Sequence, residues 1–242
     1  MLFRSGGIGA RPSRIGFVSD GDGAASAISA ALKLADMAGK GDRLPGDVYV
    51  TTHVCPDAPT QPHEPVDFMG SPIDMEVNNS FEVLPEMDAI LSLDTTKGNV
   101  VMNYKGISIS PTVKEGYILP YSPDLVRILS IVTGEPARTF GISTQDITPY
   151  GNGLYHLNSI VQPATATDAP VVGVAITTTS AVPGSGTGAS HEVDIALAAT
   201  FAIETAKEFT AGVTTFFDAA EFKDLTKLYG DMTHLKTLGK QE

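Results

Sequence analysis

Acidic and imidazole side chains follow several hydrophobic segments of this chain. Asp20 and Asp22 come after the apolar run at 15–18, and Asp94 ends the run that begins at residue 89. His53 follows residues 48–50, and His191 follows the segment 171–176 and a glycine-rich stretch. Ligands of open α/β sheets gather at the carboxyl ends of strands. Carboxylate and imidazole groups suit divalent metals, so the pattern predicts a site for one or two zinc ions, with other divalent metals as alternatives.

Each of these residues also has a purely structural interpretation. Asp is a preferred N-cap, so Asp20 or Asp22 could cap the helix expected to begin near residue 24. Asp94 could form an Asx turn with the two threonines that follow it. A single histidine such as His53 is more often an ordinary hydrogen-bonding group than a ligand.

The glycine-rich stretch at 184–188 leads directly into Ser190 and His191. It resembles a phosphate-binding loop but lacks the lysine and the spacing of a P-loop, so nucleotide binding is the weaker interpretation. Ser190 and His191 are adjacent, and adjacent residues rarely present the geometry of a nucleophile and its base.

A polar stretch at 143–153 follows another expected strand. Its hydrogen-bonding groups indicate substrate recognition, and we assign that role to Thr144, Asp146 and Asn152. The alternative is a turn with a capped helix, because the same residue types dominate turns.

Hydrophobic periodicity gives the elements that must position these residues. Strands are expected at 15–18, 47–52, 89–94, 137–142 and 171–176, with a β-hairpin formed by 100–104 and 106–110. Helices are expected at 24–38, 123–133, 152–158, 193–209 and 218–229. The predicted fold is a single α/β hydrolase-like domain over residues 1–242, a three-layer sandwich with a mixed, mostly parallel sheet and helices on both faces. A proline-rich insertion at about 56–86 is expected to form a lid or an oligomer contact, and we expect a homo-oligomer.

Composition excludes some classes of partner. The net charge is −12 and the pI is about 4.7, so no basic stripe is available for nucleic acid. No apolar run approaches the roughly 20 residues that span a bilayer. The single cysteine, Cys55, excludes an intrachain disulfide and fits a cytoplasmic protein.

The order of these features resembles the co-catalytic zinc aminopeptidases of the glutamyl-aminopeptidase and endoglucanase-M type. In that resemblance Asp20 or Asp22 takes the place of the metal-bridging residue, and Asp94 that of a ligand to one metal. The segment 144–146 resembles their Thr-Asp loop, and 190–192 resembles their terminal histidine motif. More specifically, the segments 51–60 and 144–153 resemble an uncharacterised bacterial family, domain of unknown function number 1177, over nearly the whole chain.

Two departures from the peptidase pattern matter. The glutamate pair that gives the peptidases their general base and one ligand is absent. His53 stands in about its place and could replace the ligand, but no residue clearly replaces the base, for which Asp57 is a candidate. No histidine precedes His53, and the abrupt start suggests a missing amino-terminal segment. The resemblance therefore implies a metal-dependent hydrolase that cleaves an amide bond of a small peptide or related compound. The alternative is a non-catalytic binding or assembly protein that retains the zinc-peptidase fold.

Overall fold

The fold is α/β and is built around a five-stranded mixed sheet. In the computed structural model, the described residues are 10–11, 18–55, 58–62, 68–71, 73–158, 160–182 and 189–240. The central strand β8 (Val171–Thr177) pairs in parallel with β4 (Ile90–Thr95) along one side. Along its other side it pairs antiparallel with β5 (Gly106–Ile109) and β6 (Val113–Lys114), and β6 continues to β7 (Tyr117–Ile118). Only the β4–β8 pair of this sheet is parallel, so the expected mostly parallel sheet is wrong.

Alternate residues of the two central strands point to opposite faces of the sheet, as strand geometry requires. Leu91 and Leu93 of β4 lie in one hydrophobic cluster, and Ile90 lies in the other. Val172, Val174 and Ile176 of β8 join the first cluster, whereas Val171 and Ala175 join the second. Both faces are therefore buried.

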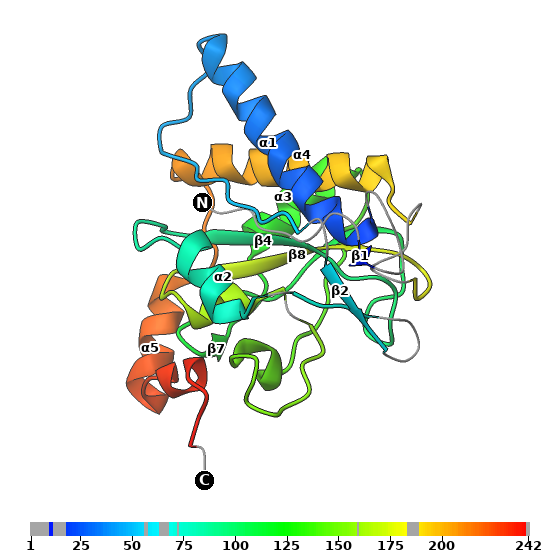
Figure 1. Ribbon diagram of the computed structural model, residues 1–242. Coiled ribbons are helices and arrows are strands. Elements are labelled where there is room, and N and C mark those ends of the chain that lie inside the picture. The colour runs from blue at the N-terminus through cyan, green and yellow to red at the C-terminus, as the bar shows by residue number, and fades with distance from the viewer. Residues whose placement is uncertain are drawn as a thin grey trace.

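Three long helices cover the first face, as Figure 1 shows: α1 (Asp22–Gly39), α3 (Pro123–Thr133) and α4 (Glu192–Thr210). Small residues bring α1 close to α4, among them Ala27 and Ala30 on α1 and Ala198 and Ala202 on α4. The helix α3 has the ends that its sequence predicts, because the Ser122 hydroxyl accepts a hydrogen bond from the backbone N–H of Leu125 at 3.2 Å.

The second face is covered differently from the expected helical layer. Short 3-10 helices, η2 (Thr144–Ile147) and η3 (Gln162–Thr165), pack there with irregular segments. The helix α2 (Met75–Glu82) is joined to η3 by a hydrogen bond of 3.2 Å from the Asn79 amide to the carbonyl oxygen of Gln162. The helix α5 (Ala219–Tyr229) and η4 (Thr233–Lys236) lie near the carboxyl end of the chain, away from α1 (Figure 1). No described helix is long and apolar enough to cross a membrane.

The proline-rich segment contains regular structure that the sequence did not predict. Besides α2 it holds β2 (Ala58–Gln61) and β3 (Phe68–Met69), which form a small sheet with β1 (Ala10–Arg11). The strand β2 is parallel to β1 and antiparallel to β3.

Three other expected elements are absent from the described part of the chain, each for a local reason. Residues 47–52 form no strand. Val48 and Tyr49 do pack on different hydrophobic clusters, as in a strand, but alternating side chains do not by themselves provide a neighbouring strand for the backbone to pair with. The expected hairpin is wrong because the Asn99 side chain accepts the backbone N–H groups of residues 101 and 102, at 2.8 and 2.9 Å, and starts a turn instead. The helix at 152–158 is wrong because Asn152 accepts the backbone N–H of Leu154 at 2.9 Å, which favours a turn. Residues 137–142 form a single bridge, from Thr139 to Ile109.

Candidate functional site

The carboxyl end of β4 lies against the beginning of α1. A short 3-10 helix, η1 (Ser19–Gly21), leads into α1, so Asp20 and Asp22 stand on either side of this junction. The Thr95 hydroxyl, at the end of β4, donates a hydrogen bond of 3.0 Å to the backbone carbonyl of Ser19. This bond fixes the end of β4, and with it Asp94, beside the two aspartates.

Lys97 follows β4 by two residues and turns back into this junction. Its ammonium lies 3.3 Å from Oδ2 of Asp22 and 3.4 Å from the carbonyl oxygen of Ala189. Only 6% of the Lys97 side chain and none of the Asp22 side chain is exposed. Because a buried charge is costly unless it is paired, this ion pair is needed for either group to remain charged. We refer to Asp20, Asp22, Asp94 and Lys97 as the acidic cluster.

Asp20 has a strongly perturbed carboxyl group. Its pKa is raised from 3.8 to about 7, first by burial and then by the negative charges of Asp94 and Asp22, while the positive charge of Lys97 opposes the rise. A carboxyl group with a pKa near 7 exchanges a proton readily at neutral pH, which is the property of a general acid or base. A perturbed group of this kind in a strand-end site is a candidate functional residue.

Asp22 is more deeply enclosed. Burial raises its pKa, whereas the nearby Ser190 hydroxyl and the charges of Lys97 and His191 lower it. The Ser190 hydroxyl faces Asp22 without reaching full hydrogen-bond geometry, because neither Ser190 Oγ nor Asp22 Oδ1 has a hydrogen-bond partner among the described residues. No side-chain hydrogen bond caps the first turn of α1, so Asp22 does not act as a helix cap.

The first turn of α4 adds a further buried carboxylate, Asp194. It is 2% exposed, and within the described chain its Oδ2 has no hydrogen-bond partner. Burial raises its pKa, and the positive charges of Lys105, His191 and Lys97 lower it. Asp194 therefore lies within electrostatic reach of Lys97 in the acidic cluster and of Lys105 in the loop before β5.

The Ser26 hydroxyl joins the two helices that carry these carboxylates. It donates to the backbone carbonyl of Asp22 at 2.8 Å and to that of Ile195 on α4 at 3.2 Å. The helices α1 and α4 therefore hold Asp22 and Asp194 in a fixed relation.

His53 makes a pair of its own with Glu82, the last residue of α2. Its Nδ1 lies 2.7 Å from Oε1 of Glu82, whose side chain is 7% exposed. The second candidate near this place, Asp57, lies outside the described residues. Glu82 is a carboxylate that was not predicted for this region.

The predicted metal centre can be tested against these contacts. The carboxylates of the acidic cluster and the imidazole of His191 are suitable donors, and the unpartnered Oδ1 of Asp22 could accept a cation. However, within the part of the chain that the structure describes, no three His, Cys, Asp or Glu residues are placed to hold a metal ion. The Lys97 ammonium also lies against Asp22. The residues as arranged do not fit a zinc centre, so zinc binding stays a prediction.

The residues predicted to bind substrate are engaged within their own loop. Asp146 Oδ2 accepts the backbone N–H of Ser143 and Oδ1 accepts that of Asn158, both at 2.8 Å. The Asn152 amide donates to the Thr148 hydroxyl at 2.8 Å, and Thr144 opens η2. The loop still approaches β4, because the Thr96 hydroxyl donates to Oδ1 of Asn158 at 3.4 Å.

Sequence reasoning also missed Lys97 and Asp194, although one signal was available for Asp194. Its position falls on the buried stripe of α4, together with Ala198, Phe201 and Thr205. An aspartate where the helical period calls for an apolar residue marks a buried charge. Lys97 carries no comparable signal, since a lysine in a turn is normally solvated.

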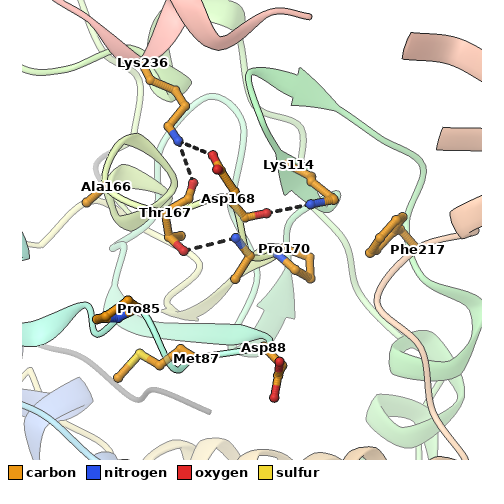
Figure 2. A pocket seen from close by; sticks show the side chains of 11 residues that line it. Pro85, Met87, Asp88, Lys114, Ala166, Thr167, Asp168, Pro170, Phe217 and Lys236 are labelled. Carbon is orange, nitrogen blue, oxygen red and sulfur yellow. Dashed lines mark hydrogen bonds and ion pairs between the residues drawn. The ribbon is translucent and has the colours of Figure 1, made fainter. Parts of the chain in front are cut away.

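Three of the cavities in the described part of the protein differ in how their charged side chains are paired. The first, of about 550 Å³, is lined by Lys114, Lys236, Asp168 and apolar residues (Figure 2). Lys236 donates to Oδ1 of Asp168 at 2.6 Å, and Lys114 donates to the carbonyl oxygen of the same residue at 2.6 Å. Figure 2 shows both lysines directed at this loop. Both lysines thus bind Asp168 directly, and Lys236 ties the carboxyl-terminal segment to the loop before β8.

The second cavity, of about 650 Å³, lies between α2, the loop at 149–151 and η3. The third, of about 460 Å³, lies between the loop before β5, the end of α3 and the first turn of α4, and Asp194 lines it. Asp194 connects this cavity with the surroundings of the acidic cluster.

The comparisons with known proteins give a family. Residues 1–239 match the model of the family described as Protein of unknown function (DUF1177). The chain belongs to this family. No curated protein matches the chain. The family assignment confirms the more specific of the two sequence resemblances.

Proposed function

We propose that the acidic cluster is the active site of a hydrolase that cleaves an amide bond of a small peptide or related compound. The main support for this proposal is Asp20, which lies beside the carboxyl end of β4. The pKa of its carboxyl group is raised to about 7. Strand ends of this kind are the usual place for catalytic groups in α/β proteins.

Asp20 supplies both proton transfers of the reaction. In its ionised form it accepts a proton from water, whose oxygen forms a bond to the amide carbonyl carbon. The protonated Asp20 then donates this proton to the amide nitrogen as the carbon–nitrogen bond breaks, and it returns to its ionised form. A pKa close to the working pH suits a group that must serve as base and then as acid.

The other members of the acidic cluster set this proton affinity. Asp94 and Asp22 raise the pKa of Asp20 through their negative charges, and Lys97 limits the rise. Lys97 also neutralises Asp22 through the 3.3 Å ion pair, so that Asp20 is the group whose proton is exchanged.

The test is turnover of a panel of aminoacyl and peptidyl substrates by purified protein. Hydrolysis is expected to change with pH around a midpoint near the pKa of Asp20 and to fall by about 10²-fold or more in Asp20→Asn. Asp36→Asn is the matched control, because Asp36 lies on α1 in an exposed pair with Lys40 at 2.8 Å. Full activity of Asp20→Asn, or no turnover of any substrate, would contradict the proposal.

A chelator arm of the same experiment tests the predicted zinc. Protein treated with chelator and protein supplied with zinc, cobalt or manganese are compared on one substrate. Turnover that survives the chelator supports proton transfer without a metal, whereas turnover that requires added metal supports the zinc-dependent alternative. Ligand binding without turnover in every arm would favour the non-catalytic binding protein.

A further inference from the structure

The cavity of about 460 Å³ beside Asp194 has the volume and the walls of a ligand site. Its volume lies within the range of small-molecule sites. Its walls come from several elements: the loop before β5, the end of α3 and the first turn of α4. It lies at the start of β5, where Gly106 pairs with Thr177 at the carboxyl end of β8. Because β4 runs parallel to β8, the carboxyl end of β4 lies at the same edge of the sheet.

Asp194 gives this cavity a buried carboxylate that forms no ion pair among the described residues. The residue is 2% exposed, and its Oδ2 accepts no hydrogen bond from the residues that the structure describes. A buried polar atom that lacks a partner costs free energy of about 1–3 kcal/mol, and more if it is charged. A ligand with a hydrogen-bonding cation would remove this cost.

Positive groups also line the cavity. Arg138 lies over the ring of Tyr104, with its guanidinium carbon 5.0 Å from the ring centroid. Its ion pair with Glu135 is long, at 3.5 Å, and both side chains are about half exposed, so this pair is weak. Lys105 is exposed and makes no ion pair within the described chain. Both cations are therefore available to a carboxylate.

The first cavity shows what a structural pair looks like in this protein. There Lys236 and Lys114 bind Asp168 directly, both at 2.6 Å. In the cavity beside Asp194, Arg138 makes a 3.5 Å pair with the second lining carboxylate, Glu135, and among the described residues neither Lys105 nor Arg138 forms an ion pair with Asp194. The difference indicates that a ligand completes the pairing.

We propose that this cavity binds a small dipolar compound, of the class of an amino acid or a short peptide, with its ammonium group on Asp194 and its carboxylate on Lys105 and Arg138. The inference rests on the proposed function in that the compound would be the substrate or product of the acidic cluster. Charges at both ends would select free peptides over blocked ones.

The test is equilibrium binding of three related peptides, measured by calorimetry on the full chain. Alanyl-alanine carries both charges, acetyl-alanyl-alanine lacks the ammonium, and alanyl-alanine amide lacks the carboxylate. The proposal predicts that alanyl-alanine binds at least ten-fold more tightly than either blocked peptide. Equal binding of the three, or no binding at millimolar concentration, would overturn it.

Two variants locate the site. Asp194→Asn, which keeps the size of the side chain, should abolish the preference for a free ammonium. Glu204→Gln is the control, because Glu204 lies on the same helix in a half-exposed pair with Lys207 at 2.8 Å, and it should keep the preference. An unchanged preference in Asp194→Asn would overturn the assignment. If Asp194→Asn does not fold, the three peptides on the unaltered protein still decide the matter.

This binding test fails separately from the hydrolase test. Preferential binding of alanyl-alanine without any cleavage would keep the cavity assignment and reject the hydrolase. Cleavage of blocked and free peptides at equal rates would keep the hydrolase and reject the dipolar ligand.

Discussion

Replacing Asp20 with asparagine should stabilise the folded protein at neutral and alkaline pH. Asparagine keeps the size of the side chain and removes the charge. The folded structure disfavours that charge through burial and through the neighbouring Asp94 and Asp22, which together raise the pKa of Asp20 from 3.8 to about 7. The unfolded chain has no such penalty.

The size and sign of the effect follow from this pKa. When a folded carboxyl group has a raised pKa, folded protein binds more protons than unfolded protein between the two values, so stability falls as pH rises through that interval. Each pH unit costs about 1.4 kcal/mol, and the interval from 3.8 to about 7 corresponds to about 4 kcal/mol. The stability advantage of Asp20→Asn should therefore be small near pH 4, grow between pH 4 and 7, and stay constant above that.

The assay is urea unfolding of chelator-treated protein at several pH values from 5 to 8.5. Asp36→Asn is again the control, because an exposed pair contributes less than about 1 kcal/mol at any pH. A stability advantage of Asp20→Asn that does not change with pH, or a loss of stability at pH 8, would refute the reasoning. Either result would mean that the Asp20 carboxyl group is solvated or held by a favourable partner.

Three further substitutions test other parts of the structure. Lys97→Met should lower the free energy of unfolding by about 3–5 kcal/mol at pH 8 in urea, because it leaves Asp22 buried and unpaired. Adding Asp22→Asn should recover most of this loss, and a loss below about 1 kcal/mol in Lys97→Met would contradict the ion pair. Gly173→Ala should cost about 1–3 kcal/mol in the same assay, since a Cβ there would lie 2.7 Å from Cγ2 of Ile160, and the cost should shrink in an Ile160→Ala background. Lys236→Ala should speed amide hydrogen exchange at 231–240, because it removes the 2.6 Å bond to the loop before β8; unchanged exchange would mean that the segment is held by other contacts.

Elements with local signals at their ends were predicted closely. The helix α3 was expected at 123–133 and occupies Pro123–Thr133, because Ser122 caps it and Gly134 ends it in the left-handed conformation, with φ 69°. The strand β8 and the helix α4 were also found within one residue of their expected ends, since their apolar patterns are long and unbroken.

Strand pairing was predicted poorly, because partners are chosen by tertiary structure. The segment that contains β5 was expected to pair with the residues just before it, whereas β5 pairs with β8, about 70 residues later. Local alternation fixes which side chains are buried, but it does not decide whether a neighbour is parallel or antiparallel. The mostly parallel sheet was wrong for this reason.

The candidate site was anticipated in part. Residues at strand ends were expected to converge, and the structure brings Asp20, Asp22 and Asp94 close enough for their charges to interact. His191 acts on Asp22, whereas His53 pairs with Glu82. Lys97 could not be foreseen, because the burial of a turn lysine depends on how α1 and α4 pack above the sheet.

The most direct measurement of the central claim is the titration of the aspartate side chains by carbon-13 NMR on protein labelled at the carboxyl carbons. The account predicts one aspartate with a midpoint near pH 7, and its signal should be missing from the spectrum of Asp20→Asn. If every carboxyl group of the native protein titrates below pH 5, Asp20 is an ordinary acid and the proposed proton transfer is wrong.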